Sequence, residues 1–304
     1  MMPQYNRRDF LKTSLAGLGL AVTVPHHLTA AELARPLAFK GTDIVPLGKT
    51  GIQVTRLAQG TGYNGVKHTS AHTRAGKESF DRLVHHSIDR GITFIDMADL
   101  YGSMPFMKDV LKGMKRDRFV LLSKLWPRPA SWVTPSGGAK AEVDRFRQEL
   151  DTDMLDVCLI HCMTNDKWPA EYERIRDELS ELKQKKIIRA AGVSCHDFGA
   201  LKVAAEHPWV DVIFARINHI GGKQYSCDAS AEELAPVLKT ARKNGKAVVG
   251  MKIFGAGKLV KPDEKDASLK FVFQNGLVDA ITVGALKPEE VDDTLDRMAK
   301  VKRA

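Results

Sequence analysis

From residue 56 to the C-terminus, short continuous apolar runs alternate with amphipathic segments. The apolar runs predict buried parallel strands near 56–60, 92–96, 119–124, 155–161, 188–194, 210–216, 247–253 and 279–284. The amphipathic segments predict helices near 75–90, 103–114, 139–150, 170–185, 197–207, 231–244, 264–275 and 287–299. Eight strands, each followed by a helix at a spacing of about 30 residues, predict a (β/α)8 TIM barrel.

Two short apolar runs precede the first of these strands. Residues 44–47 and 52–54 flank the sequence Gly48-Lys49-Thr50-Gly51, which predicts a β-hairpin. We therefore place the barrel domain at 44–304 and a linker at 32–43. The Pro- and Gly-rich stretch 131–138 is expected to be a longer loop over the strand-end face.

The first 31 residues have the order of an export signal. Arg7 and Arg8 form a twin-arginine motif, a weakly apolar stretch follows at 15–24, and small residues stand at 28–31. The apolar stretch is too short for a stable membrane span. We predict a twin-arginine signal peptide over 1–31, cleaved near residue 31, and a mature protein carried to the periplasm by the twin-arginine translocase. This route carries folded proteins, so a cofactor inserted before export is expected.

Composition narrows the class of protein further. Of the 304 residues, 43% are hydrophobic, which is ordinary for a globular domain, and the net charge is +9. The basic residues are scattered beside acidic ones on predicted helices, which favours a solvated surface and no nucleic-acid partner.

The four cysteines, Cys158, Cys162, Cys195 and Cys227, include no C-x-x-C pair, so we expect no metal site and buried free thiols. A Cys162–Cys195 or Cys195–Cys227 disulfide remains open.

Four ionisable residues stand at or just beyond the ends of three predicted strands: Asp96, Tyr101, Lys124 and His161. Because the carboxyl ends of barrel strands meet on one face, these side chains are expected to converge. An ammonium group close to Tyr101 would lower the pKa of the phenol, Asp96 would hold the ammonium in place, and His161 would donate to a substrate oxygen. The alternative is structural, with Asp96 and Lys124 as a buried ion pair and His161 as a core histidine. Four residues in register with strand ends favour catalysis.

The chain resembles the aldo-keto reductase family in its hairpin Leu47-Gly48-Lys49-Thr50-Gly51-Ile52, in the element from Asp96 to Gly102 (Asp-x-Ala-x-x-Tyr-Gly), and in Gly192-Val193-Ser194. The resemblance covers residues 44 to 299. It implies a barrel that binds NADP(H), with Tyr101 as proton donor, Lys124 and Asp96 as the groups that tune it, and His161 as the residue that orients the substrate.

The resemblance also implies a set of cofactor-binding residues, although several depart from the family pattern. Cys195 stands where the family has Asn, Met251 where it has Tyr, and Glu290 follows Lys287 where basic residues are usual. NAD(H) in place of NADP(H), or loss of the cofactor, therefore remains open. The predicted cofactor-binding residues are Ser194, Cys195, Met251, Lys252, Gly255, Gly257, Gly284 and Lys287.

The sequence thus predicts an exported oxidoreductase that reduces a small-molecule carbonyl or oxidises an alcohol, such as a sugar or polyol. One alternative keeps Tyr101, Lys124 and His161 for an elimination or isomerisation that needs no cofactor. The other is a barrel without catalytic activity that binds a carbohydrate.

Overall fold

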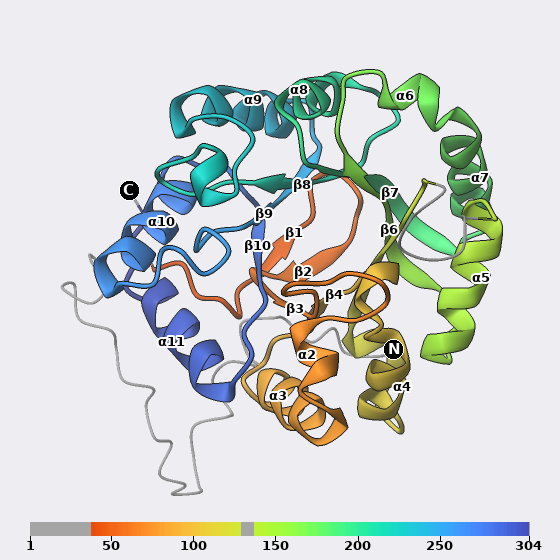
Figure 1. The fold of residues 1–304 in the computed structure, drawn as a ribbon, viewed down its shortest axis with the longest axis horizontal. Helices are drawn as coiled ribbons and strands as arrows, with labels where there is room; N and C mark the ends of the chain where they lie inside the picture. Colours follow the sequence, from red (N-terminus) through yellow and green to blue (C-terminus); the bar gives the residue numbers. More distant parts are fainter. Residues whose placement is uncertain (1–37, 129–136, 304) are drawn as a thin grey trace, which may run out of the picture. The chain divides into compact units, whose positions relative to one another are not determined.

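A closed ring of eight parallel strands forms the centre of the molecule (Figure 1). The structure, a computed structural model, describes residues 38–128 and 137–303, so the predicted signal peptide at 1–31 and most of the 131–138 loop lie outside the described residues. Sequential strands pair with one another, and the last strand pairs with the first. The predicted barrel is therefore confirmed. Its strands are β3 (Leu57–Gly60), β4 (Phe94–Asp96), β5 (Val120–Leu125), β6 (Leu155–Met163), β7 (Ile188–Cys195), β8 (Val212–Arg216), β9 (Ala247–Met251) and β10 (Ala280–Val283).

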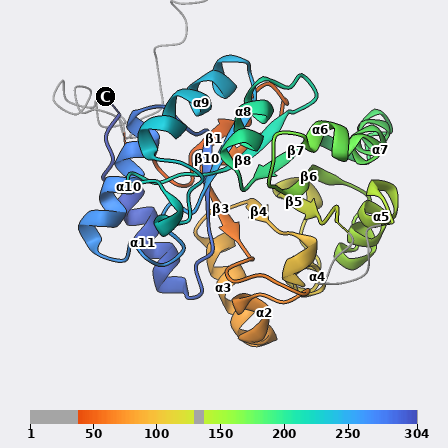
Figure 2. The same cartoon turned by 45° about the horizontal axis from the view of Figure 1, so that its top comes forward.

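Helices surround this ring, as the tilted view in Figure 2 also shows. Two short helices that the sequence did not predict, α2 (Ala71–Arg74) and α6 (Trp168–Glu171), precede longer ones. The eight longer helices match the predicted segments. They are α3 (Lys77–Asp89), α4 (Met104–Leu111), α5 (Ala139–Leu150), α7 (Glu173–Gln184), α8 (Phe198–Glu206), α9 (Ala231–Lys243), α10 (Pro262–Gln274) and α11 (Pro288–Met298).

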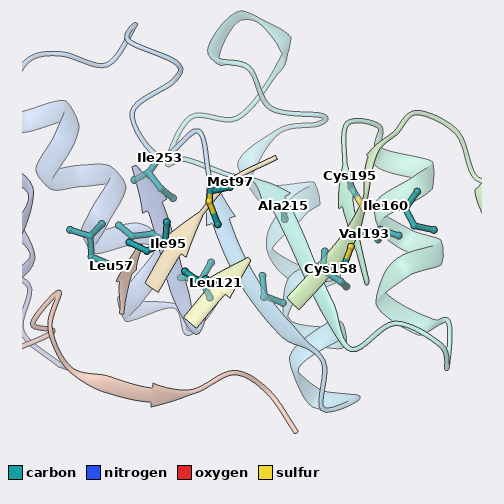
Figure 3. Packing of buried hydrophobic residues seen from close by; sticks show 14 of the residues in the cluster. Leu57, Ile95, Met97, Leu121, Cys158, Ile160, Val193, Cys195, Ala215 and Ile253 are labelled. Carbon is teal, nitrogen blue, oxygen red and sulfur yellow. The ribbon is translucent and has the colours of Figure 1, made fainter. Parts of the chain in front are cut away.

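The core has two layers because successive side chains of a strand point to opposite faces. In β7, Ala190 packs in the cluster inside the ring, whereas Ala191, Val193 and Cys195 pack in the outer cluster between the ring and the helices. Figure 3 shows Val193 and Cys195 near Cys158 and Ile160 of the neighbouring strand β6. All four cysteines are free thiols, and only Cys162 is not fully buried.

The hairpin β1 (Ile44–Pro46) and β2 (Gln53–Thr55) forms a separate two-stranded sheet whose residues help to fill the ring. Leu47, Ile52 and Val54 are fully buried in the inner cluster. Gly48 has a φ of +55°, and a Cβ at this position would lie 2.4 Å from the backbone nitrogen of Ala247. The turn therefore needs glycine, as the hairpin motif predicted. The hairpin lies at the end of the barrel where the strands begin, since Gly48 packs against Ala247 at the start of β9. The opposite end, where the strands finish, is left for a site.

The described part of the stretch predicted as a linker packs against the barrel domain. Ala38 pairs with Lys302, and the ring of Phe39 stacks on Phe273 with centroids 5.2 Å apart. Within 38–128 and 137–303, no helix is long and apolar enough to cross a membrane, and no cluster of His, Cys, Asp and Glu could hold a metal ion.

Candidate active site

Asp96 and Lys124 form a buried ion pair at the C-terminal ends of β4 and β5. Lys124 is 1% exposed; its Nζ donates to Oδ1 of Asp96 and, at 3.0 Å, to the backbone oxygen of Met97. The other carboxylate oxygen of Asp96 accepts a hydrogen bond of 2.8 Å from the hydroxyl of Thr282 on β10. Both oxygens are thus held, and the position of the ammonium group is fixed.

Tyr101 follows β4 on a single 3-10 turn, Asp99–Tyr101, that ends at Gly102. Gly102 has a φ of +62°, and a Cβ there would lie 1.9 Å from the backbone oxygen of His68, so only glycine ends the turn without displacing it. Glycines also flank the Tyr101 ring: a Cβ at Gly62 or Gly65 would lie 2.2 Å and 2.4 Å from ring carbons. The chain thus holds the phenol in a slot that side chains would close.

Lys124 and His161 contact the Tyr101 ring from neighbouring strands. The Nζ of Lys124 lies 5.2 Å from the ring centroid of Tyr101, and His161 of β6 meets that ring edge-on with centroids 5.7 Å apart. The four predicted catalytic residues are therefore brought together.

The direction of the Tyr101 pKa differs from the sequence prediction. Burial, followed by the carboxylate of Asp96, raises the pKa of Tyr101 well above its usual value of 10.0, whereas we expected the ammonium group to lower it. The reason is that removal of water from the phenol, together with the charge of Asp96, outweighs the ammonium group of Lys124, which donates to Asp96. Tyr101 is therefore a protonated hydrogen-bond donor throughout the neutral pH range.

His161 is neutral in the same range. Burial lowers its pKa well below 6.5, and the positive charges of Lys124, His196, Arg128 and Lys252 lower it further. Its Nδ1 is buried and makes no hydrogen bond with the described residues. A neutral imidazole can donate one hydrogen bond to a substrate oxygen but is not a strong acid.

A cavity of about 440 Å³ extends from Asp96, Tyr101 and Lys124 toward Glu290 and Thr294 of α11. This volume is typical of a small-molecule or cofactor site. Four of the predicted cofactor-binding residues line it: Met251, Lys252, Gly257 and Gly284. At Gly257, φ is +86° and a Cβ would lie 3.0 Å from the hydroxyl of Tyr63, so glycine keeps the wall open there. A dinucleotide that places its nicotinamide near Tyr101 fits the position and lining of this cavity.

The other four predicted cofactor-binding residues, Ser194, Cys195, Gly255 and Lys287, do not line the cavity. Ser194 accepts a hydrogen bond of 2.9 Å from the backbone nitrogen of Cys162. Cys195 is fully buried in the outer core cluster, because it lies one residue beyond Ser194 on the strand and points to the opposite face. As placed, its thiol cannot reach a ligand in the cavity, and the prediction for Cys195 is corrected.

Sequence reasoning missed Thr282, Trp126 and Arg128. Thr282 stands at the end of β10, so the rule that strand ends carry site residues could have found it. The Trp126 ring meets His161 edge-on at 5.9 Å, and the guanidinium carbon of Arg128 lies 5.1 Å from the Trp126 ring centroid. Both follow β5, where no periodic signal distinguishes a site residue from a loop residue.

The family model for the aldo/keto reductase family matches residues 56–276, most of the barrel. The chain belongs to the aldo/keto reductase family. A 6-dehydroglucose reductase of Novosphingobium aromaticivorans is 25% identical over 254 residues, which cover 76% of this chain and 74% of that protein.

Solved structures share the barrel. A protein from Pseudomonas aeruginosa assigned to the aldo-keto reductases is 25% identical with a TM-score of 0.69, over 86% of this chain and 96% of that chain. An aldo/keto reductase of Klebsiella pneumoniae, in complex with NADP and acetate, is 19% identical with a TM-score of 0.63, over 84% of this chain and 89% of that one. Family membership supports a nicotinamide-dependent oxidoreductase that acts on small-molecule carbonyl compounds.

Proposed function

We propose that this protein is an exported reductase that transfers hydride from NADP(H) to the carbonyl carbon of a small molecule, with Tyr101 as the proton donor. One observation carries the proposal: Tyr101 and the Lys124–Asp96 pair line one end of a cavity that predicted cofactor residues also line, and His161 packs edge-on against the Tyr101 ring. A bound nicotinamide would supply the hydride.

Each residue has a distinct part in this reaction. Tyr101 protonates the substrate oxygen as it becomes negative, and neutral His161 donates a hydrogen bond to the same oxygen. Lys124, held by Asp96, places a positive charge beside the phenol where negative charge develops after proton transfer. The raised pKa of Tyr101 keeps the phenol protonated at neutral pH, which is the form that reduction requires.

The alternatives are a lyase or isomerase without a cofactor and a barrel that only binds a carbohydrate. The cavity extends beyond Tyr101 and Lys124 to Glu290 and Thr294 of α11, which supports an elongated ligand such as a dinucleotide over these alternatives. A sugar or polyol derivative is the proposed substrate class, in keeping with the 6-dehydroglucose reductase relative. Glu290 would repel a 2′-phosphate, so NAD(H) is the second candidate cofactor.

The proposed cofactor can be tested by binding. NADPH should quench the tryptophan fluorescence of the purified mature protein, residues 32–304, in a saturable way. The protein should then oxidise NADPH when a small aldehyde is added. A parallel titration with NADH identifies the preferred nucleotide, and titration of buffer alone corrects for absorbance of the nucleotide itself. No saturable binding of either nucleotide, in protein from which denaturation and mass spectrometry release no bound nucleotide, would refute a redox role and leave the two alternatives.

We further propose that the twin-arginine signal delivers the protein to the periplasm. Because this route carries folded proteins, the cofactor would be inserted before export. Replacement of Arg7 and Arg8 by Lys should retain the precursor in the cytoplasm, which fractionation and immunoblotting would detect. Replacement of Lys12 by Arg is the matched control and should leave export intact. Unchanged export of the double variant would refute the assignment.

A further inference from the structure

Four cations lie around His161 and the cavity. Lys124 and Lys252 line the cavity, Arg128 donates to the backbone oxygen of Cys162, and Arg216 donates to that of His196. Each of them lowers the pKa of the Cys162 thiol, although burial raises that pKa to about 11 overall. Cys162 follows His161 directly on β6, so the positive charge is concentrated beside the hydrogen-bond donors that would hold the carbonyl oxygen.

Nearby carboxylates neutralise only two of these cations. Asp96 pairs with Lys124, and Asp228 pairs with Arg216 through both carboxylate oxygens. Asp197 caps α8 by accepting from the backbone nitrogen of Ala200. Among the described residues, neither Arg128 nor Lys252 forms an ion pair with a carboxylate.

Arg128 is held close to His161 by its contacts. Its Nη2 donates to the backbone oxygen of Cys162 at 2.5 Å and to the hydroxyl of Thr164 at 3.0 Å. The indole of Trp126 contacts both groups: its ring centroid lies 5.1 Å from the guanidinium carbon of Arg128 and 5.9 Å from the centroid of the His161 ring. Arg128 also contacts Tyr172, through a side-chain hydrogen bond and with its guanidinium carbon 5.8 Å from the ring centroid. A guanidinium group has five N–H donors, so these bonds still leave donors for a ligand.

Lys252 lies on the cavity side of the same region. It lines the cavity with Tyr101 and Lys124, and its backbone has a left-handed φ of +61°, which turns the chain at the end of β9. His196 completes the surroundings: its Nε2 lies 3.5 Å from the Cys162 sulfur, and its ring meets His161 edge-on at 6.4 Å.

We propose that Arg128, with Lys252 on the cavity side, forms a subsite for a carboxylate group, so that the substrate is a carbonyl compound that also carries a carboxylate. This deepens the proposed function and rests on it for the carbonyl; the anion subsite itself does not require a cofactor. A carboxylate suits a guanidinium group because two parallel N–H bonds can reach its two oxygens.

The test is a binding measurement that needs no turnover. Calorimetric titration of the mature protein should show benzoate binding about 10-fold or more tighter than its neutral isostere benzamide, as expected for a charge-assisted hydrogen bond. Arg128→Gln should bring the ratio of the two affinities close to one. Arg128→Lys, the matched control, keeps the charge and should retain most of the preference, and melting curves should show that both variants are folded.

Each remaining outcome decides the proposal. Equal binding of benzoate and benzamide, or an unchanged ratio in folded Arg128→Gln, overturns the subsite. Tighter binding of inorganic phosphate than of benzoate through Arg128 overturns the choice of carboxylate. If NADPH does not bind while benzoate remains preferred, the reductase proposal fails and the subsite stands. If both hold, 4-carboxybenzaldehyde should be reduced with a lower KM than its methyl ester, and Arg128→Gln should reduce that difference.

Discussion

At Tyr101, burial and the carboxylate of Asp96 act in the same direction and oppose the ammonium group of Lys124. The four ionisable groups could be predicted from the ends of three apolar runs, but their balance could not. A sequence indicates which charges are near one another; the sign of a pKa shift depends on how much water is removed and on which partner the lysine faces. Here Lys124 faces Asp96.

The raised pKa of Tyr101 makes a prediction about pH. Reduction needs the protonated phenol, and a pKa above 10.0 keeps it protonated, so kcat for reduction at saturating NADPH should vary less than about 2-fold between pH 6.5 and 8.5. Neutral His161, whose pKa lies below 6.5, does not titrate in this window. A steady-state pH series would check this. A fall of about 10-fold per pH unit within the window would mean that Lys124 acidifies the phenol after all.

Gly102 ends the 3-10 turn after β4, and Gly113 follows helix α4; both have a positive φ, so alanine substitutions at the two positions can be compared directly. Gly113 has a φ of +78°, and a Cβ there would meet no other atom. Gly113→Ala should therefore lower the free energy of unfolding only by the cost of a left-handed alanine, about 1 kcal/mol. Gly102→Ala adds a collision with His68 and should cost about 2 kcal/mol more, with a fall in kcat because Tyr101 moves. Urea unfolding and kcat measurements would show it. Equal losses in both variants would contradict the role of this turn.

The elements themselves were largely predictable. Strands buried on both faces are continuous apolar runs, so β5 and β7 were located to within about two residues. The short helices α2 and α6 were missed because four residues are too few to show a period. Cys195 occupies the position of a cofactor ligand in the family motif, but side chains alternate along β7 and this one faces the outer core. The motif alone therefore gives a wrong prediction for Cys195.

At the scale of the whole molecule, closure of the ring is what assembles the site. Thr282 on the last strand donates to Asp96 on the second, across 186 residues of sequence, because β10 and β4 both pair with β3. No local pattern encodes that contact. The anion subsite has the same origin, since Arg128 follows β5 and Lys252 follows β9. The barrel could be predicted from repetition along the chain, whereas these pairings depend on its closure.

The central claim is that Tyr101 protonates the carbonyl as hydride reaches it. Single-turnover oxidation of bound NADPH by an aldehyde, followed by stopped flow, tests this in the wild-type protein and in Tyr101→Phe. Tyr225→Phe, which removes a phenol outside the cavity, is the control. We predict that Tyr101→Phe slows the transient about 100-fold or more while NADPH affinity stays within about 2-fold. A transient of wild-type rate in Tyr101→Phe would contradict the account.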